Sequence, residues 1–494
     1  MSGADTRPLR VLMLAAECTP YAWTGGLGDV VGSLPTALRK LGADVRVALP
    51  HYGSIDPAVH PITTNGAALK VSMNGIVEQG KIGEVEQSPF PLYLIGSDDY
   101  FANRPELYGY PDDGHRFVFF SRGALAATRT LGWQPDVVHC HDWHSGLVPN
   151  WIHAARGNGA QADTPATALT IHNLAYQGLF GEDLLQVAGL AEGGFLEHPT
   201  DPELTSRLNF LARGIRYADA VNTVSATYAK EILTPAYGER LDPLLRERQD
   251  GIAGIVNGID TVAFDPACDP HLAANFSVRN PAGRAQNKAA LQRELGLPVE
   301  ADTPLLGMVS RLADHKGLDL LAPVVPHIVE RGAQLAVLGT GDPRHHELLA
   351  QASREHPRHV GLALRFDPPL AQRIYGGSDI FLMPSRHEPC GLGQLIAMRY
   401  GSVPVVRATG GLADTVDDFD ARTKDGTGFV FHRYDPIDFF GAVARALETY
   451  RYPDAWRALM RQGMSRDSSW DAAARGYLDL YSRALESRRS ARAP

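Results

Sequence analysis

The chain has 494 residues, 44% of them hydrophobic, and a formal net charge of −9 at pH 7. At roughly 100–200 residues per domain, this length predicts two large domains or several small ones. An acidic chain without a basic face is not expected to bind nucleic acid. The four cysteines stand far apart without a C-x-x-C pair, which argues against a disulfide framework or a zinc site and fits the cytoplasm.

The N-terminal segment does not look like a targeting signal. Its first apolar run, 11–16, stops at Glu17 and is too short for a signal-peptide core or a membrane span. No later run reaches the roughly 18 apolar residues that a spanning helix needs. We therefore expect no membrane partner.

Short apolar runs alternate with amphipathic stretches in the first half of the chain, a pattern typical of βαβ units around a parallel sheet. Residues 68–95 alternate more loosely, which indicates antiparallel hairpins. In chain order, the other predicted elements are a strand at 10–16, a helix at 29–41, a strand at 44–49, a helix at 115–131, strands at 136–140 and 166–171, a helix at 205–218, and strands at 220–224 and 252–256.

The same alternation restarts after residue 300, and Gly, Pro and Asp between 257 and 266 mark the boundary. We expect an α/β protein with two doubly wound Rossmann-like domains, 1–257 and 258–469, facing an interdomain cleft, and a tail, 470–494, whose last residues are disordered. The predicted elements of the second domain are strands at 304–309, 334–338, 379–383 and 403–406, and helices at 317–331, 344–355, 368–376 and 391–400.

A glycine-rich segment, 24–29 (TGGLGD), follows the first strand and opens a helix. Glycine lets the backbone approach a ligand closely, and free N–H groups at a helix start favour an anion. The segment is not G-x-G-x-x-G, so the dinucleotide fingerprint is absent. An ordinary glycine-rich turn stays an equal alternative.

Three further segments run from a strand end towards a helix in the second domain. Arg311 and Lys316 lie in the segment 310–318 (SRLADHKGL). The guanidinium of Arg311 can bind two phosphate oxygens at once, and the ammonium of Lys316 adds a compact positive charge. Glu388 lies in 384–394 (PSRHEPCGLGQ), where a carboxylate near helix amides could hold sugar hydroxyls. The segment 409–415 (TGGLADT) is another glycine loop. Taken singly, a solvated basic loop and a helix-start charge favoured by the dipole are the alternatives.

Histidine-rich segments follow two strands of the first domain, at 141–144 (HDWH) and 172–178 (HNLAYQG). Their side chains could contact sugars or be buried polar groups. A metal site is less favoured, because no tight ligand spacing accompanies them. The D-x-D at 418–420 is interpreted as part of a solvated loop.

Together these segments resemble the glycogen and starch synthase family, whose members are retaining glucosyltransferases with the GT-B fold. The resemblance runs in order from about residue 10 to about residue 480. The segments that carry it are TGGLGDVVGSLP, HDWHSGL, TIHNLAYQGLF, YADAVNTVSATYAKEI, GIVNGIDTVAFDP, SRLADHKGLDLL, SRHEPCGLGQL, TGGLADTV and DSSWDAAARGYLDLY. The last of these resembles a closing helix that returns to the N-terminal domain.

The resemblance implies a role for particular residues. Arg311 and Lys316 would neutralise the donor pyrophosphate, and Glu388 would orient the donor glucose. His172 would contact the glucose, and Asp142 would lie on the acceptor side. The further implied substrate-binding residues are Trp23, Thr24, Gly25, Gly26, Asp29, Tyr108, Asn257, Phe366 (against the nucleotide base), Cys390 (a packing thiol), Gly391, Leu392, Thr409, Gly410 and Gly411.

The implied reaction moves glucose from ADP-glucose to the non-reducing end of an α-1,4-glucan, such as glycogen or a maltooligosaccharide. Configuration would be retained, with no metal and no other cofactor. The residues do not distinguish ADP-glucose from UDP-glucose, and they leave the oligomeric state open. The rival functions are a phosphorylase holding pyridoxal phosphate, a nucleotide-sugar epimerase, and a glucan-binding scaffold without turnover.

The chain departs from the family pattern at two positions. Trp23 stands where the family usually has Lys, and Gly393 where it commonly has Thr. A lost charge-assisted contact costs on the order of 1.5–3 kcal/mol. Trp23 is either tolerated, with Arg311 and Lys316 holding the phosphates, or alters donor choice or turnover by stacking on a base or sugar.

Overall fold

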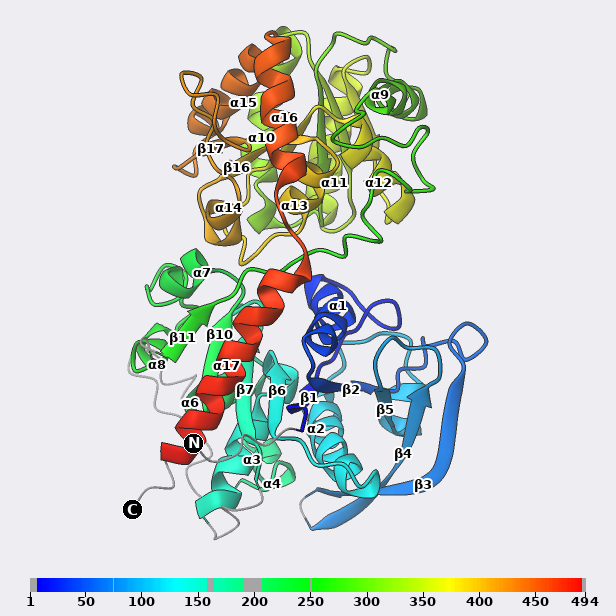
Figure 1. Ribbon diagram of the computed structural model, residues 1–494, viewed down its shortest axis with the longest axis vertical. Coiled ribbons are helices and arrows are strands. Elements are labelled where there is room, and N and C mark those ends of the chain that lie inside the picture. The colour runs from blue at the N-terminus through cyan, green and yellow to red at the C-terminus, as the bar shows by residue number, and fades with distance from the viewer. Residues whose placement is uncertain (1–6, 74, 158–163, 191–206, 249–250, 491–494) are drawn as a thin grey trace. The chain divides into compact units, whose positions relative to one another are not determined.

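A computed structural model describes residues 7–73, 75–157, 164–190, 207–248 and 251–490 (Figure 1). The chain forms two compact units. The first contains Met1–Gly258 together with Trp470–Pro494, and the second contains Ile259–Ser469. Among the described residues, no helix is long and apolar enough to cross a bilayer.

The first unit is built on a mixed sheet that has nine strands within the described residues, in the order β11-β10-β7-β6-β1-β2-β5-β4-β3. Strands from β11 to β5 run parallel, and β4 pairs antiparallel with both β3 and β5. Their bounds are β1 Arg10–Leu14, β2 Asp44–Pro50, β3 Ile62–Met73, β4 Ile76–Val85, β5 Leu92–Gly96, β6 Val137–His141, β7 Ala166–Ile171, β10 Ala220–Thr223 and β11 Ile252–Gly254. The looser alternation at 68–95 therefore does form hairpins.

Helices cover this sheet, and the last of them comes from the far end of the chain. Helix α17, Trp470–Ser490, contacts α1, β7 and β10, and Figure 1 shows it in red along these strands. Tyr477 and Tyr481 are fully buried, and each large buried side chain contributes about 1.5–3 kcal/mol. Other helices of the unit are α1 Gly26–Lys40, α2 Asp113–Thr130, α3 Leu147–Ala155, α4 Asp183–Val187, α6 Phe210–Tyr217, α7 Ala226–Glu231 and α8 Asp242–Arg246.

One predicted helix of this unit begins later than expected. The helix expected at 205–218 begins at Phe210, because the Asn209 side chain accepts a hydrogen bond from the Ala212 N–H and caps it. Leu208–Asn209 (β9) pairs with Leu179–Phe180 (β8), and 205–206 lie outside the described residues. The tail is helical to Ser490, and 491–494, where disorder was expected, also lie outside the described residues.

The second unit holds a parallel sheet with six strands within its described residues, in the order β14-β13-β12-β15-β16-β17. The strands are β12 Leu305–Val309, β13 Gln334–Leu338, β14 Val360–Ala363, β15 Ile380–Met383, β16 Val403–Arg407 and β17 Phe429–Phe431. The helices are α9 Gly283–Glu294, α10 Leu318–Glu330, α11 Pro343–Glu355, α12 Pro368–Gly377, α13 Gly393–Arg399, α14 Gly410–Thr415, α15 Pro436–Tyr450 and α16 Pro453–Ser465. The sequence did not predict the two edge strands, β14 and β17.

Neighbouring strands place the chemical motifs together at one end of each sheet. In the first unit β1, β6 and β7 are adjacent, and their carboxyl ends lead into the glycine loop and the two histidine segments. In the second unit β12, β15 and β16 are adjacent and lead into the segments of Lys316, Glu388 and Thr409. These carboxyl ends are where doubly wound sheets bind ligands.

Candidate functional site

The glycine loop of the first unit closes on an acidic residue. Glu17 follows β1 and is 5% exposed. One carboxylate oxygen accepts hydrogen bonds from the backbone N–H of Thr24 at 2.7 Å and of Gly25 at 3.0 Å. The other accepts from the Thr24 hydroxyl at 3.0 Å and the Tyr108 hydroxyl at 2.8 Å. The loop's N–H groups that we expected to meet an external anion are thus bonded to an internal one.

Helix α1 begins at Gly26, three residues earlier than predicted. Asp29 lies in its first turn, and burial together with the charge of Glu17 raises the pKa of Asp29 to about 6. Trp23 precedes the loop and is 42% exposed. An indole this exposed adds little to the core of the unit. Any effect of Trp23 on the enzyme therefore depends on the ligands that its ring contacts at the surface.

Asp142 directly follows β6, and its backbone has φ 54°, a left-handed conformation that residues other than glycine rarely adopt. Such backbone strain costs about 1–3 kcal/mol and clusters at functional sites. Its carboxylate accepts a hydrogen bond of 2.7 Å from the His172 backbone N–H. Burial raises the pKa of Asp142 to about 7, although the backbone N–H groups of His172 and Asn173 oppose that rise.

His172, at the end of β7, is paired with a second histidine. Its Nε2 lies 2.9 Å from Nδ1 of His141, the last residue of β6. Burial lowers the pKa of His172 and of His144 to about 3. The His144 ring packs on that of Tyr108, with centroids 5.0 Å apart. These imidazoles are therefore neutral near pH 7 and act through hydrogen bonds, not charge.

A pocket of about 450 Å³ adjoins the same two segments. Trp143 and Tyr176 line it, and Tyr176 is 50% exposed. Glu239 and Arg240 on the facing loop both have positive φ, and the Gln177 side chain donates to the Glu239 carbonyl at 2.8 Å. Aromatic faces beside polar groups suit a sugar chain.

Tyr108 and Asn257, two further predicted residues of the first unit, lie in different surroundings. Tyr108 joins the cluster through its hydrogen bond to Glu17, and burial raises its pKa well above the usual value. Asn257 is 7% exposed at the end of the unit, and its Oδ1 has no hydrogen-bond partner among the described residues. A buried amide oxygen in this state is suited to accept from a ligand.

A buried ion pair forms the centre of the second unit's site. Lys316 Nζ lies 2.6 Å from Glu388 Oε2, and the Ser385 hydroxyl donates to the same oxygen at 3.0 Å. Burial alone would raise the pKa of Glu388, but the charge of Lys316 and the hydrogen bonds from Lys316 and Ser385 lower it overall. Glu388 is therefore ionised at neutral pH while being only 8% exposed.

Glycines allow the three segments of this site to meet. Gly317 has φ 76°, and a Cβ there would lie 2.1 Å from the Pro384 carbonyl oxygen. Gly410 has φ 46°, and its Cβ would lie 2.0 Å from the Glu388 carbonyl oxygen. The backbone N–H of Gly411 donates to that oxygen at 3.1 Å. A side chain at either glycine would separate the segments that carry Lys316 and Glu388.

The remaining residues of the Glu388 segment pack rather than react. The Cys390 thiol is buried. Gly391 has φ 73°, and the Gln394 side chain donates to its carbonyl at 2.8 Å. Helix α13 begins at Gly393, not at 391 as predicted, with Leu392 as its N-cap. Thr409 is buried and is the N-cap of α14.

Two predicted residues of the second unit lie at its surface. Arg311 follows β12 and is exposed, and Phe366 is 73% exposed between β14 and α12. Each follows a strand carboxyl end, as the Lys316 and Glu388 segments do. Their roles toward phosphate and base stay predictions.

The acidic loop at 418–420 serves the fold. Asp418 accepts from the Arg445 guanidinium at 3.0 Å and from the Val430 N–H at 2.7 Å, and Asp420 pairs with Arg422. No group of three or more His, Cys, Asp or Glu side chains among the described residues could hold a metal ion. The absence of a metal requirement stays a prediction.

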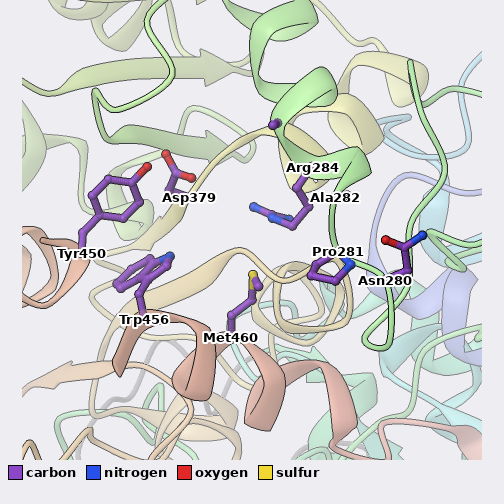
Figure 2. Close-up of a pocket in the computed structure, with 9 residues that line it drawn as sticks. Asn280, Pro281, Ala282, Arg284, Asp379, Tyr450, Trp456 and Met460 are labelled. Carbon is purple, nitrogen blue, oxygen red and sulfur yellow. The ribbon is translucent and has the colours of Figure 1, made fainter. Parts of the chain in front are cut away.

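Figure 2 shows a pocket of about 360 Å³ elsewhere in the second unit, with Tyr450, Trp456 and Met460 around the guanidinium of Arg284. Asp379 stands immediately before β15, so this pocket lies at the amino ends of the strands, away from Glu388. Arg284 donates to the carbonyls of Ser378 and Tyr400, and Asp379 pairs with Lys288 at 2.7 Å. None of the residues that the sequence singled out lines it.

Comparison with known proteins decides the family. The family described as "Starch synthase catalytic domain" matches residues 10–247, and "Glycosyl transferases group 1" matches 303–449. The glycogen synthase of Anaeromyxobacter dehalogenans is 45% identical over 96% of this chain and 99% of its own length, and that of Gloeobacter violaceus is 47% identical over 96% and 98%. The chain belongs to the glycogen and starch synthase family.

Solved structures agree with this assignment. The catalytic domain of starch synthase IV from Arabidopsis thaliana, bound to ADP and acarbose, has a TM-score of 0.89 and 35% identity, covering 97% of this chain and 100% of that one. Sucrose-phosphate synthase from Thermosynechococcus elongatus has a TM-score of 0.59 at 19% identity and covers 97% of this chain and 99% of that one, which supports the fold alone. The predicted α/β fold of the GT-B type, with two doubly wound domains, is confirmed, and the chain is a glycosyltransferase.

Two residues of the site were missed by reasoning from sequence. Glu17 was noted only as the charge that ends the first apolar run. His141 was seen as part of a histidine segment but was given no role. A carboxylate that directly follows a buried strand and precedes a glycine loop was the signal that could have identified Glu17.

Proposed function

We propose that this chain transfers glucose from ADP-glucose to the non-reducing end of an α-1,4-glucan, with retention of configuration. The observation that carries the proposal is the buried Lys316–Glu388 pair, at 2.6 Å, in a chain similar over nearly its whole length to glycogen synthases. Lys316 is a cation that can bind the diphosphate of a nucleotide sugar, and Glu388 is an ionised carboxylate that can accept hydrogen bonds from its sugar hydroxyls. Each residue follows the carboxyl end of a strand.

The second unit would hold the donor. Lys316 and the exposed Arg311 would bind the pyrophosphate, whose charge grows as the glycosidic bond breaks. Glu388 would accept hydrogen bonds from glucose hydroxyls, because its ionised oxygens are acceptors only. Backbone N–H groups of Gly391, Leu392 and the 409–411 loop would add donors, and Phe366 would pack on the base.

The first unit would hold the acceptor. Asp142 and His172 would contact sugar hydroxyls, and the His172 imidazole would do so in its neutral form. The adjoining pocket, with Trp143 and Tyr176, would take further glucose units of the glucan chain. The network of Glu17, Tyr108 and the glycine loop would keep this surface rigid.

In this proposal the 4-hydroxyl of the glucan attacks the anomeric carbon from the face that the phosphate leaves. The departing phosphate takes the hydroxyl proton, so the protein does not need a general base at that atom. Arg311 and Lys316 supply the positive charge that other transferases obtain from a metal, and we expect activity without one.

ADP-glucose is preferred because the starch synthase with the similar structure is bound to ADP. We also expect the enzyme in the cytoplasm, since its four cysteines are free.

The test is incorporation of labelled glucose into glycogen from ADP-glucose and UDP-glucose in parallel, with chelator added and Glu388→Gln as the inactive control. Incorporation from ADP-glucose that is lost in the variant would support the proposal. A preference for UDP-glucose would overturn the donor assignment and direct attention to Trp23. No incorporation from either donor, with glycogen still bound, would replace the proposal with a scaffold function.

A further inference from the structure

Three histidines from two adjacent strands form a buried row behind the acceptor site. His139 and His141 are on β6, and their ring centroids are 4.1 Å apart. His141 contacts His172 through Nδ1 and Nε2, 2.9 Å apart, with the rings 30° from parallel. The other nitrogen of His141, Nε2, is buried and has no hydrogen-bond partner among the described residues.

The unpartnered Nε2 of His141 indicates which ring nitrogens of His141 and His172 carry a proton. Burial lowers the pKa of His141 and His172 well below neutrality, so each ring carries one N–H. If His172 donated to His141, the His141 proton would sit on Nε2 as a buried donor without an acceptor. If His141 donates from Nδ1, its Nε2 is left as a bare lone pair, which costs less because orphaned buried N–H groups are the rarer and more expensive defect.

The third histidine has the opposite arrangement and provides a contrast. The Thr170 hydroxyl donates to Asn222 Oδ1 at 2.7 Å, so it accepts from His139 Nε2, also at 2.7 Å. His139 Nδ1 then accepts from the Tyr481 hydroxyl on α17 at 2.9 Å. His139 therefore carries its proton on Nε2, where it cannot reach His141.

We propose that His141 is a positioning residue that donates from Nδ1 to His172 Nε2, so that His172 carries its own proton on Nδ1 and presents it to an oxygen of the bound sugar. His172 Nδ1 has no hydrogen-bond partner among the described residues. The His172 backbone N–H is held separately by Asp142. The sugar as recipient rests on the proposed function, whereas the tautomer does not.

The tautomer of His172 determines whether its ring donates a hydrogen bond to the sugar or accepts one from it. With the proton on Nδ1, His172 is a hydrogen-bond donor, complementary to Glu388 and Asp142, which accept when ionised. With the proton on Nε2, His172 would present a lone pair and would require the sugar hydroxyl to donate. Burial and the neighbouring imidazoles keep the rings of His139 and His141 neutral, and burial alone does so for His172. The charged groups nearby are Asp142, which accepts from the His172 backbone N–H, Glu17, which acts on Asp142, and Arg116, which acts on His144.

The direct test is ¹⁵N NMR of the whole enzyme labelled in its histidine rings, without substrate. Ring nitrogens with and without a proton differ in shift by tens of ppm, and His172→Gln, His141→Asn and His139→Gln assign the signals. We expect a protonated Nδ1 for His172 and His141 and a protonated Nε2 for His139 in the same spectrum. A protonated Nε2 on His172 would overturn the proposal, whatever the enzyme's activity.

The second test compares two replacements of His141. The side-chain amide of His141→Asn can donate from the place of Nδ1, whereas His141→Leu cannot. We expect kcat/KM for the glucan to fall at least 30-fold in His141→Leu and to stay within 5-fold of the parent in His141→Asn, with ADP binding equal in all three. Equal losses in both variants would show a packing role only and contradict the proposal. His327→Asn, a surface histidine that is 55% exposed, is the matched control.

If the parent enzyme transfers no glucose, the proposed function fails, and the NMR measurement still decides the tautomer. If His141→Leu does not fold, as shown by near-ultraviolet circular dichroism, the spectrum of the parent enzyme remains the deciding observation.

Discussion

Two buried carboxyl groups, one in each unit, have pKa values that are shifted in opposite directions. Asp142 is 6% exposed and Glu388 is 8% exposed, so both lose nearly the same hydration. Burial raises the pKa of Asp142 to about 7, with only backbone N–H groups against it. The pKa of Glu388 is lowered, because Lys316 and Ser385 outweigh the same desolvation. The Lys316 cation at 2.6 Å and the Ser385 hydroxyl make the difference.

The comparison assigns a different character to the cluster in each unit. The second unit keeps a full charge pair in place and suits the phosphates and hydroxyls of a charged donor. The first unit surrounds its acid with neutral imidazoles and suits an uncharged sugar chain. Four changes would break or sharpen this contrast.

Glu388→Gln should have the largest effect, a fall in kcat of about 10²–10³-fold, because the ionised acceptor is lost from the reacting centre. Glu388→Ala should in addition destabilise the fold, by less than the roughly 3–5 kcal/mol of a fully buried pair, since Lys316 loses its partner while its side chain is only 17% exposed. Steady-state kinetics and urea unfolding measure the two effects. Glu347→Gln at the surface is the control and should change neither, and wild-type kcat in Glu388→Gln would remove the donor role from this residue.

Asp142→Asn should change how stability depends on pH. The pKa of Asp142 is raised from 3.8 to about 7, so folding favours its protonated form, and the stability that this provides is lost as pH rises from about 4 to about 7. From pH 5 to pH 8 the parent should lose roughly 2–3 kcal/mol relative to Asp142→Asn. Urea unfolding at both values measures it. Parallel stabilities across this range would show that Asp142 is ionised throughout, and Asp98→Asn, at an exposed site, is the control.

Glu17→Ala removes the acceptor of the hydrogen bonds from Thr24, Gly25 and Tyr108 and should loosen the glycine loop. We expect kcat/KM for the glucan to fall by about 10-fold, which corresponds to about 1.4 kcal/mol. Glu17→Gln should cost less, because one oxygen can still accept from the N–H groups of Thr24 and Gly25 while the amide donates to the two hydroxyls. The pair is compared by steady-state kinetics with glycogen. An equal loss in Glu17→Gln and Glu17→Ala would argue that charge, not loop position, is what Glu17 supplies.

Trp23→Lys should have the smallest effect, from no change to a rise of about 10-fold in activity, because at a position that is 42% exposed a restored charge-assisted contact is worth about 1.5 kcal/mol, the lower end of its usual range. Activity with ADP-glucose and UDP-glucose is measured for Trp23→Lys and Trp23→Ala. A large loss in both variants, with unchanged unfolding, would show that the indole itself binds a base or a sugar.

The sequence by itself determined the architecture. Alternating strand and helix periods predicted two doubly wound domains, and nearly every chemical motif was placed correctly at a strand carboxyl end. These features are readable because they depend on residues within one element. The edge strands β14 and β17 and the starts of α1, α6 and α13 were missed. A single cap at Asn209 sets the start of α6, which the apolar pattern does not reveal.

Only the tertiary structure decided the charges and contacts of the site. It showed that Glu17 occupies the N–H groups of the glycine loop, that His141 holds His172, and that Lys316 neutralises Glu388 from 72 residues away. The pKa values of Asp142 and Glu388 could not be predicted from their neighbours in sequence. The physical reason is that desolvation and Coulomb energy depend on which groups lie within a few ångströms in a low-dielectric interior, and folding brings those groups from distant parts of the chain.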